Sequence, residues 1–271
     1  MRWRLIVDGA QRGAWNMAVD EALVEAVDRG DSPPVLRFYR WEPACLSLGF
    51  AQPFGAADAE FCAANGVDLV RRPTGGRAVL HHLEQTYCVL ARLNERPFTA
   101  DLQAAYQGIC RALVVGLVKL GAPAGLAGAP SNGHVKPTEA IPCFIGPASG
   151  EVVANGRKLI GSAMRRHNRA ILQHGSLLED WDGRLQAGCL GLADDSALRP
   201  AVTTLRELMG TPPDPQAVAR ALALGFEGAF GVALEASILS DPERGRATFL
   251  ARERYGHERW TVHRNRELPA D

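Results

Sequence analysis

The chain has 271 residues, of which 46% are hydrophobic, so it is long enough to bury a substantial core and is not expected to be disordered. Its 30 basic and 30 acidic side chains cancel, so the composition does not imply a strong general affinity for nucleic acid or for an anionic membrane. No apolar run is long enough to cross a bilayer and the first residues lack a signal-peptide core, so we expect a cytoplasmic protein.

The first half of the chain predicts strands that alternate with helices. We expect a strand over 3–7, an amphipathic helix over 14–27, strands over 35–39 and 46–48, and a short helix over 58–64. A strand over 67–71 leads directly into the pair Gly75 and Gly76. A further strand over 86–93 precedes a long helix, and Asp101 can cap the N-terminus of that helix.

The second half begins with a stretch rich in Gly, Ala and Pro, 121–147, which predicts irregular structure and carries Cys143 on a loop. Asn155-Gly156 between two short strands is a β-hairpin signal, with Lys158 just past the turn. A strand over 169–177 follows, and from about 181 the chain is mainly helical, with a capping box at Thr204 and Glu207. The elements predict an α/β (α+β) fold, a mixed β-sheet flanked by helices.

The cysteines show no metal or disulfide pattern. Without a Cys-x-x-Cys pair they predict neither a zinc site nor a disulfide framework, and most should be small core residues. They are Cys45, Cys62, Cys88, Cys110, Cys143 and Cys189. Lysine occurs only at Lys119, Lys136 and Lys158, and a lysine is of interest because a buried ammonium can take part in chemistry.

The Gly75-Gly76 loop can bring backbone amides close to a polar ligand. It is neither a Walker loop nor a dinucleotide-binding fingerprint, and a simple tight turn between strands is the alternative. Several donors surround the loop and favour an anionic or carbonyl-bearing ligand, although some can equally be solvated surface charge. These donors are Arg71, Arg72, Arg77, His81 and His82.

Cys143 and Lys158 are a candidate pair for acyl chemistry. A thiol becomes a good nucleophile when it ionises, and a nearby cation favours the thiolate. Lys158 is a candidate for that cation, but separation in sequence does not establish contact. The alternative is an idle loop thiol at Cys143.

Five segments of this chain resemble the biotin/lipoate protein ligase and transferase superfamily. They are 15–23, 36–41, 71–82, 156–163 and 172–176, and the likeness runs in order from about Trp3 to Leu208. Within the superfamily the chain is most similar to the octanoyltransferases of the LipM type, which pair a cysteine in Pro-Cys-Phe with the lysine of Gly-Arg/Lys-Lys. Lipoate ligases typically have a Gly-Gly-Gly loop and no equivalent cysteine, whereas this chain has Gly-Gly-Arg and Cys143.

The resemblance implies the catalytic-domain fold of that superfamily, as a single catalytic domain over 1–271. It also implies that Cys143 attacks octanoyl-acyl carrier protein to form an acyl-enzyme, and that Lys158 activates the thiol and helps to hold the acyl carbonyl. A lysine of a lipoyl domain, such as the glycine cleavage H protein, then accepts the octanoyl group. No ATP, cofactor or metal is implied.

The resemblance further implies a substrate pocket built from the glycine loop and two later segments. Its residues are Arg72, Thr74, Gly75, Gly76, Arg77, Ala78, His81, His82, Gly161, Ser162, Ala163, His174 and Gly175. His81 or His82 could orient the carbonyl or relay a proton, and a structural histidine bonded to backbone is the alternative.

Three other functions are compatible with the sequence. An ATP-dependent lipoate or octanoate ligase would use Lys158 to bind an acyl-adenylate, and ATP dependence distinguishes it. A transferase that moves octanoate between lipoyl domains differs in its acyl donor. A non-catalytic protein that binds lipoyl domains or acyl chains is the third, and the presence of both Cys143 and Lys158 argues against it.

Overall fold

The computed structural model describes residues 1–128, 150–211 and 213–268. Its centre is a six-stranded sheet in the order β10-β11-β6-β2-β1-β12. Strand β1 is parallel to β2 and β12, whereas the remaining neighbours are antiparallel, so the sheet is mixed, as the sequence predicts. The strands are β1 (Arg2–Gln11), β2 (Val35–Trp41), β6 (Glu84–Arg92), β10 (Ile160–His167), β11 (Ala170–Leu178) and β12 (Ala233–Ala236).

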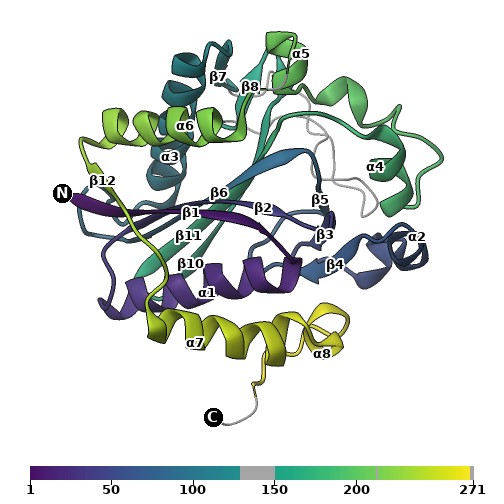
Figure 1. The fold of residues 1–271 in the computed structure, drawn as a ribbon, viewed down its shortest axis with the longest axis horizontal. Coiled ribbons are helices and arrows are strands. Elements are labelled where there is room, and N and C mark those ends of the chain that lie inside the picture. Colours follow the sequence, from purple (N-terminus) through teal and green to yellow (C-terminus); the bar gives the residue numbers. More distant parts are fainter. Residues whose placement is uncertain (129–149, 212, 269–271) are drawn as a thin grey trace.

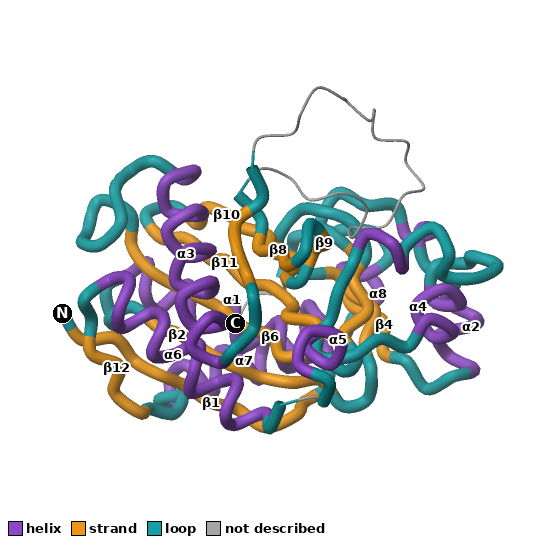
Figure 2. Tube along the Cα trace, turned by 90° about the horizontal axis from the view of Figure 1, so that it is seen from above, coloured by secondary structure: helices purple, strands orange, loops and turns teal. Residues whose placement is uncertain are grey.

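Helices cover both faces of this sheet (Figure 1). On one face α3 (Leu102–Leu120) and α6 (Pro215–Phe230) pack against each other, as the view from above also shows (Figure 2). On the other face lies α1 (Gly13–Arg29), and α7 (Asp241–Leu250) packs against it. Each face therefore has its own hydrophobic core.

Helix α3 shows why the local sequence forms the predicted element. The Asp101 carboxylate accepts hydrogen bonds from the backbone amides of Gln103 and Ala104, which satisfies two of the free amides at the helix start. Ile109, Leu113 and Leu117 are four residues apart, lie on one face and are fully buried. Burying each such side chain stabilises the fold by about 1.5–3 kcal/mol.

Two small sheets lie beside the large one. In the first, β3 (Cys45–Leu48) is parallel to β4 (Asp68–Arg71) on one side and antiparallel to β5 (Val79–His81) on the other. The second has the order β7-β8-β9 and comprises β7 (Ala124–Leu126), β8 (Val152–Ala154) and β9 (Arg157–Lys158).

Strand β7 corrects the prediction that 121–147 is irregular. Residues 124–126 form a strand because β8, which comes much later in the chain, supplies its hydrogen-bonding partner. Most of that stretch, with Cys143, lies outside the described residues.

The predicted hairpin at Asn155-Gly156 is confirmed. Both turn residues have positive φ angles, 51° and 75°, and β8 pairs with β9 across the turn. The second arm is divided, however, because β9 ends at Lys158 and the chain then enters β10 of the large sheet at Ile160. Lys158 is therefore the last residue before the chain passes from one sheet to another.

The C-terminal portion is mainly helical, as predicted, but it also contains β12 at the edge of the large sheet. The predicted capping box is only half formed. The Thr204 hydroxyl accepts the amide of Glu207 at 3.3 Å, while the Glu207 carboxylate pairs with Arg157 and Arg199. The remaining elements are α2 (Ala59–Ala64), α4 (Gly183–Cys189), α5 (Leu205–Met209), α8 (Glu258–Thr261), the 3₁₀ turns η1 (Phe54–Ala56) and η2 (Arg199–Ala201), and the π-helical η3 (Ala251–Tyr255).

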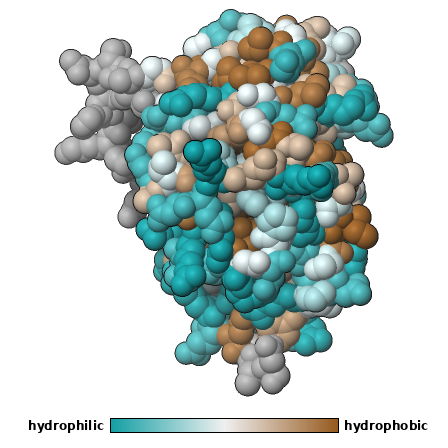
Figure 3. All heavy atoms as spheres, turned by 90° about the vertical axis from the view of Figure 1, so that its left-hand side faces the viewer, coloured by the Kyte–Doolittle hydropathy of each residue, from teal (hydrophilic) through white to brown (hydrophobic). Residues whose placement is uncertain are grey.

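The surface is mixed in character. On the face that Figure 3 shows, hydrophobic atoms form several separate patches among hydrophilic ones. Over the described ranges, no helix combines the length and the apolar character that crossing a bilayer requires.

Candidate functional site

A narrow cavity lies where the large sheet, the small β4-β3-β5 sheet and the start of α1 meet. Its volume, counted as the space open to the centre of a water-sized sphere, is about 30 Å³. Apolar side chains and a few polar groups share its wall, which is typical of a site for a small organic group. The lining residues are Met17, Tyr39, Trp41, Ser47, Arg72, Val79, His81, Thr86, Gly161, Ser162, Ala163, His174, Gly175 and Ser176.

The Gly-Gly loop lies next to this cavity because it connects β4 to β5, which pair with opposite edges of β3. The chain after β3 closely approaches the loop. A side-chain carbon added at Gly49 would lie 1.9 Å from the carbonyl oxygen of Gly76, and the amide of Phe50 donates to the carbonyl of Thr74 at 2.8 Å. The loop is thus held against the segment that follows β3 by close packing and a hydrogen bond.

Arg71 and Arg72 also hold this loop. The Arg72 guanidinium donates to the carbonyl of Ser47 at 2.9 Å through Nη1, and to those of Gly75 and Arg77 at 2.8 and 2.6 Å through Nη2. Arg71 is fully buried and its Nη1 donates to the carbonyl of Gly49 at 2.8 Å. These contacts of the two arginines shape the backbone around the cavity, and Arg72 also lines its wall.

His174 connects the loop to a buried charge cluster. Its Nε2 lies 2.7 Å from Thr74 Oγ1, and its Nδ1 lies 3.2 Å from a carboxylate oxygen of Asp20. Asp20 also accepts from Arg37 at 2.7 Å and from the Tyr39 hydroxyl at 2.8 Å. Burial by itself would raise the pKa of Asp20, but the hydrogen bond from His174 and the charge of Arg37 outweigh it and lower that pKa. In the neutral tautomer whose Nδ1 donates to Asp20, Nε2 accepts the Thr74 hydroxyl.

Of the two adjacent histidines, His81 lines the cavity, and its Nε2 lies 2.8 Å from the Ser47 hydroxyl. Its ring stacks on Trp41 with the ring centres 4.0 Å apart. Burial lowers the pKa of His81 below its ordinary value, so the ring is neutral at pH 7. His82 is half-buried and is not part of the cavity wall.

Lys158 is 2% exposed, and its ammonium pairs with the carboxylate of Glu151 at 2.7 Å. The charge of Glu151 acts on Tyr106 of α3, whose pKa burial raises above its ordinary value. The Ser162 hydroxyl of the cavity wall lies 2.7 Å from the hydroxyl of Tyr87. A buried cation thus lies beside the strand that carries Gly161, Ser162 and Ala163.

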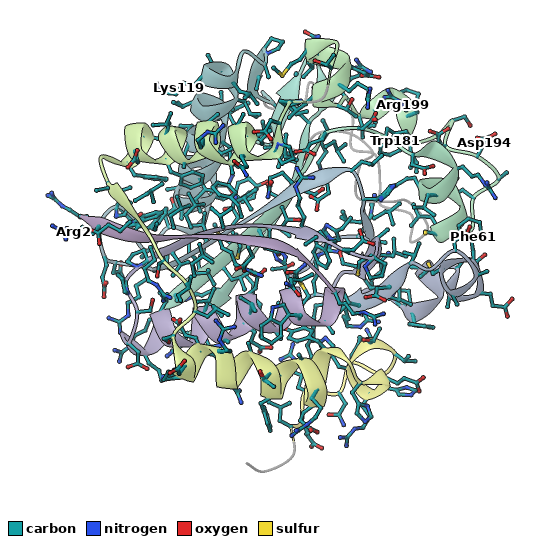
Figure 4. All side chains as sticks on the ribbon, viewed as in Figure 1. Arg2, Phe61, Lys119, Trp181, Asp194 and Arg199 are labelled. Atoms are coloured by element: carbon teal, nitrogen blue, oxygen red, sulfur yellow. The ribbon has the colours of Figure 1, made fainter. Side chains whose placement is uncertain are left out.

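The segment after α4 contacts the backbone of β9, the strand that ends at Lys158. Lys158 forms a parallel bridge with Val202, and the Lys158 carbonyl accepts the amide of Thr203 at 2.9 Å. Figure 4 shows Trp181 and Arg199 in this part of the molecule, where the guanidinium carbon of Arg199 is 6.0 Å from the centre of the Trp181 ring.

The cysteines within the described residues are free and buried, as expected for core thiols. Burial raises the pKa of Cys45 and Cys88 well above the ordinary range and that of Cys110 to about 12. The Cys62 and Cys189 thiols interact with each other, which lowers the pKa of Cys62 and raises that of Cys189. Cys143, the candidate nucleophile, lies outside the described residues.

The chain on either side of the undescribed stretch is held beside the lysine pair. The amide of Gly150 donates to the carbonyl of Ala127 at 3.0 Å, and the amide of Ala127 donates to the carbonyl of Glu151 at 2.8 Å. The residue that pairs with Lys158 is therefore the second residue of the described chain after Cys143.

Some of the predicted site residues lie together in the wall of the cavity. Seven predicted residues line the cavity: Arg72, His81, Gly161, Ser162, Ala163, His174 and Gly175. The others in the described chain are not among the lining residues. They are Thr74, which His174 contacts, the rest of the loop (Gly75, Gly76, Arg77 and Ala78), His82, and Lys158. Within the described parts of the chain, no group of three or more His, Cys, Asp or Glu side chains is arranged to hold a metal ion.

The sequence reasoning missed several polar residues that support the site. Asp20 looked like one of the acidic residues of an amphipathic helix, and its partner His174 is 154 positions away. Tyr39 and Trp41 belong to a segment that carried the family resemblance, but neither was named as a site residue. Glu151 lies seven positions before Lys158, on the other side of the hairpin turn, and that antiparallel pairing was the one signal that could have indicated the contact.

Comparison with known proteins places this geometry in a family. Residues 12–227 match the family model described as the lipoyl protein ligase A/B catalytic domain. Octanoyltransferase LipM of Symbiobacterium thermophilum is 37% identical over 96% of this chain and 98% of its own length. Octanoyltransferase LipM of Kyrpidia tusciae is 41% identical over 89% of this chain and 92% of its own.

Solved structures share the fold. Lipoate-protein ligase A bound with ATP superimposes with a TM-score of 0.80 at 24% identity, covering 97% of this chain and 99% of the other. A lipoate protein ligase of Thermoplasma acidophilum gives a TM-score of 0.80 at 23% identity and covers 100% of both chains. At this level of identity the likeness concerns the fold alone.

Proposed function

The chain belongs to the family of the lipoyl protein ligase A/B catalytic domain and is an acyltransferase, and we propose that it transfers an octanoyl group from octanoyl-acyl carrier protein to a lysine of a lipoyl domain. We propose the glycine cleavage H protein as the acceptor and the whole of 1–271 as one catalytic domain. The observation that carries the proposal is the buried Lys158 ammonium beside the wall of a partly apolar cavity.

In the first step, the Cys143 thiolate attacks the thioester carbonyl of the donor. The bond between the carbonyl carbon and the carrier sulfur breaks, the carrier thiolate leaves and takes up a proton, and the octanoyl group becomes a thioester of Cys143. The Lys158 ammonium favours the thiolate and the negative charge that develops on the carbonyl oxygen. The backbone of Gly75 and Gly76 is proposed to approach that carbonyl, with the acyl chain in the cavity.

In the second step, the neutral amine of the acceptor lysine attacks the Cys143 thioester. The bond between carbon and the Cys143 sulfur breaks, an amide forms, and the proton that the amine loses goes to the departing Cys143 thiolate. Exchange between thioesters is nearly balanced and conversion of a thioester to an amide runs downhill. The reaction therefore needs no ATP, unlike activation of a free acid.

The state of the other thiols supports Cys143 as the nucleophile. The thiolate is the reactive form of cysteine, and a thiol in apolar surroundings is inert. Burial raises the pKa of Cys45, Cys88 and Cys110, and Cys189 is buried. Cys62, whose pKa is lowered by Cys189, is only 1% exposed. The described chain also resumes after Cys143 beside Glu151, the partner of Lys158.

The test is a transfer assay with octanoyl-acyl carrier protein and a purified lipoyl domain, with and without ATP. We expect ATP-independent transfer that Cys143→Ser abolishes and that the matched variant Cys62→Ser, altered at a buried thiol of α2, retains. Modification of the domain only with free octanoate and ATP would make the protein a ligase. Transfer by Cys143→Ser at the normal rate would remove Cys143 from the mechanism.

A further inference from the structure

Three polar side chains on neighbouring strands of the large sheet form a row of hydrogen bonds that ends at the cavity wall. The Nε2 amide of Gln173 donates to the Tyr87 hydroxyl at 2.9 Å, and the Tyr87 hydroxyl lies 2.7 Å from that of Ser162. Gln173 and Tyr87 are fully buried, whereas Ser162 is half-buried and lines the cavity. The row therefore leads from the core to a hydroxyl that a ligand can reach.

A glycine makes the contact between Tyr87 and Ser162 possible. Gly175 of β11 lies opposite Tyr87 on one neighbouring strand and opposite Ser162 on the other. A side-chain carbon at this position would lie 2.6 Å from Tyr87 Cε1 and 2.8 Å from Ser162 Oγ, and both distances are too short for non-bonded atoms. The missing side chain thus leaves the space in which the phenol of Tyr87 reaches Ser162.

The direction of the hydrogen bonds follows from the amide of Gln173. Its NH₂ group has two hydrogens and two partners, the Tyr87 oxygen and, at 3.8 Å, Cys110 Sγ. The opposite orientation of the amide would leave both hydrogens unpaired in the core, whereas the present one leaves only the carbonyl oxygen without a partner. Burial raises the pKa of Tyr87 well above its ordinary value, so the phenol keeps its proton. Tyr87 accordingly accepts from Gln173 and donates its own hydrogen to Ser162.

Ser162 then keeps its own hydrogen for a further acceptor. The hydroxyl of Tyr106 on α3 also interacts with Ser162, and burial raises the pKa of Tyr106, so this phenol is neutral as well. A neutral phenol oxygen is a weaker acceptor than a carbonyl oxygen on which negative charge develops, because hydrogen bonds to ionised groups are about twice as strong. A reacting carbonyl beside Ser162 would therefore take this hydrogen in preference to Tyr106.

We propose that Ser162 is a catalytic residue that donates a hydrogen bond to the carbonyl oxygen of the bound octanoyl group, and that Tyr87 is the positioning residue that directs it. The inference rests on the proposed acyl transfer and adds a side-chain donor to the backbone of Gly75 and Gly76. When a nucleophile adds to the carbonyl carbon, the electron pair of the π bond moves to the oxygen. The hydrogen bond from Ser162 strengthens while the proton stays on Ser162, so it stabilises the oxyanion of both steps.

The direct test observes this hydrogen bond on a ligand that cannot react. In a ketone analogue of octanoyl-pantetheine a methylene group replaces the thioester sulfur, and a ¹³C label at the carbonyl gives a separate infrared band. A hydrogen bond to the oxygen lowers the frequency of that band. We expect the band of the bound ketone to lie at lower frequency in the wild type than in Ser162→Ala, with Tyr87→Phe in between. Isothermal titration calorimetry establishes that each protein binds the ketone.

Two controls remove a tyrosine hydroxyl elsewhere. Tyr106→Phe removes the other phenol oxygen that interacts with Ser162, and should not raise the frequency of the band. Tyr255→Phe removes a buried hydroxyl that donates to Glu21 at 2.7 Å, outside the cavity wall, and should change neither the band nor the transfer rate.

Thermal unfolding identifies variants that fail to fold. If Ser162→Ala is one of them, Tyr87→Phe/Ser162→Ala replaces it in the infrared measurement. Removing both hydroxyls together leaves neither of them unpaired, and the expected band is that of a carbonyl without this donor.

A second arm measures single-turnover transfer from octanoyl-acyl carrier protein. Ser162→Ala should lower the maximal rate roughly tenfold or more, with little change in the donor concentration that gives half of it, because the hydrogen bond strengthens in the transition state. Tyr87→Phe should slow the wild type about three- to tenfold, the change that one hydrogen bond makes. In the Ser162→Ala background it should slow transfer by less than about twofold, because Tyr87 acts through Ser162.

The outcomes separate this inference from the proposed function. Bound ketone with the same band in the wild type and in Ser162→Ala would overturn the inference and leave the proposed transfer intact. Equal slowing by Tyr87→Phe in both backgrounds, or a band that Tyr106→Phe raises and Tyr87→Phe does not, would overturn the role of Tyr87. A ketone that binds to none of these proteins would count against the proposed function and the inference together.

Discussion

Three polar side chains in or near the cavity wall have buried partners. His174 lies between Thr74 and Asp20, His81 contacts Ser47, and Lys158 pairs with Glu151. Such contacts fix the orientation of these groups before any substrate arrives, which is the arrangement that electrostatic stabilisation of a transition state requires. Substituting one of these partner residues should therefore change the site, even though the partner itself does not contact the substrate.

Asp20→Asn is predicted to destabilise the fold by about 1.5–3 kcal/mol, because it removes one of the two carboxylates that pair with the fully buried Arg37 at 2.7 Å and leaves Asp8 as the other. The folded-state pKa of Asp20 is lowered, so wild-type Asp20 contributes stability that is present above about pH 4, its unfolded value, and lost as the pH falls through the folded value. Urea unfolding from pH 7 to pH 2 should show a weaker acid dependence for Asp20→Asn. An equal acid dependence in both proteins would contradict this assignment.

Thiol labelling with iodoacetamide is predicted to separate Cys143 from the buried cysteines. At pH 8 a thiol such as Cys110, with its pKa raised from 9.0 to about 12, holds roughly a thousandfold less thiolate than an ordinary one. Peptide mass spectrometry of briefly treated native protein should therefore find the label on Cys143 first. Preferential labelling of Cys110 or Cys88 would contradict the predicted difference in reactivity.

At the scale of elements, the site depends on two connections between sheets. The loop over 72–78 joins the two outer strands of the small sheet, and the hairpin over 152–158 leads Lys158 from β9 towards β10. Each connection is held by contacts to a distant element, the first by Gly49 and the second by Val202.

Gly49→Ala is predicted to displace the glycine loop, because its added carbon would lie 1.9 Å from the carbonyl oxygen of Gly76. We expect a loss of about 1–3 kcal/mol in stability and a fall of about tenfold or more in transfer rate. Gly55→Ala is the matched control, since no atom lies within 4 Å of its added carbon. Steady-state kinetics and thermal unfolding of both variants measure the effect, and equal behaviour of the two would show that the close approach is unimportant.

Local patterns were sufficient to predict the longer elements. The helix over 102–120 has its cap and its apolar stripe within its own sequence, and the Asn155-Gly156 turn carries its own φ preference. The three-residue strands β5 and β7 were not predicted, because a short strand is defined by its partner and not by its own residues. The capping box at Thr204 failed because Glu207 pairs with two arginines.

At the scale of the whole molecule, the C-terminal helices support the site from the far side of α1. Trp260 of α8 donates its indole N–H to the carbonyl of Arg71 at 2.7 Å, and Arg71 Nε donates to the carbonyl of Thr261 at 2.9 Å. Arg71 in turn donates to the carbonyl of Gly49. The last helix is thus connected to the glycine loop through one arginine.

Trp260→Ala is predicted to cost about 3–5 kcal/mol of stability and to reduce transfer, because the support of Arg71 is lost. Trp260→Phe keeps most of the packing and removes the donor to a buried carbonyl, so its cost should be smaller, about 1–3 kcal/mol. Thermal unfolding and transfer rates of the two variants give the comparison. Full transfer activity in Trp260→Ala would mean that α8 does not support the loop.

The family resemblance allowed much of the candidate site to be named, but not its internal contacts. The glycine loop, Lys158 and His174 were all recognised in sequence motifs. The contacts of His174 with Asp20 and of Trp260 with Arg71, by contrast, join residues that are 154 and 189 positions apart. Contacts of that range depend on how whole layers pack, which no local pattern encodes. The order of the strands in the large sheet could not be predicted from the sequence for the same reason.

The measurement that tests the central claim most directly is the intact mass of the protein after mixing with octanoyl-acyl carrier protein without ATP, followed by addition of a lipoyl domain. We predict one octanoyl adduct on Cys143 that hydroxylamine removes and that passes to the domain when it is added. The contradicting result is a protein that carries no adduct, together with a domain that is modified only when free octanoate and ATP are supplied.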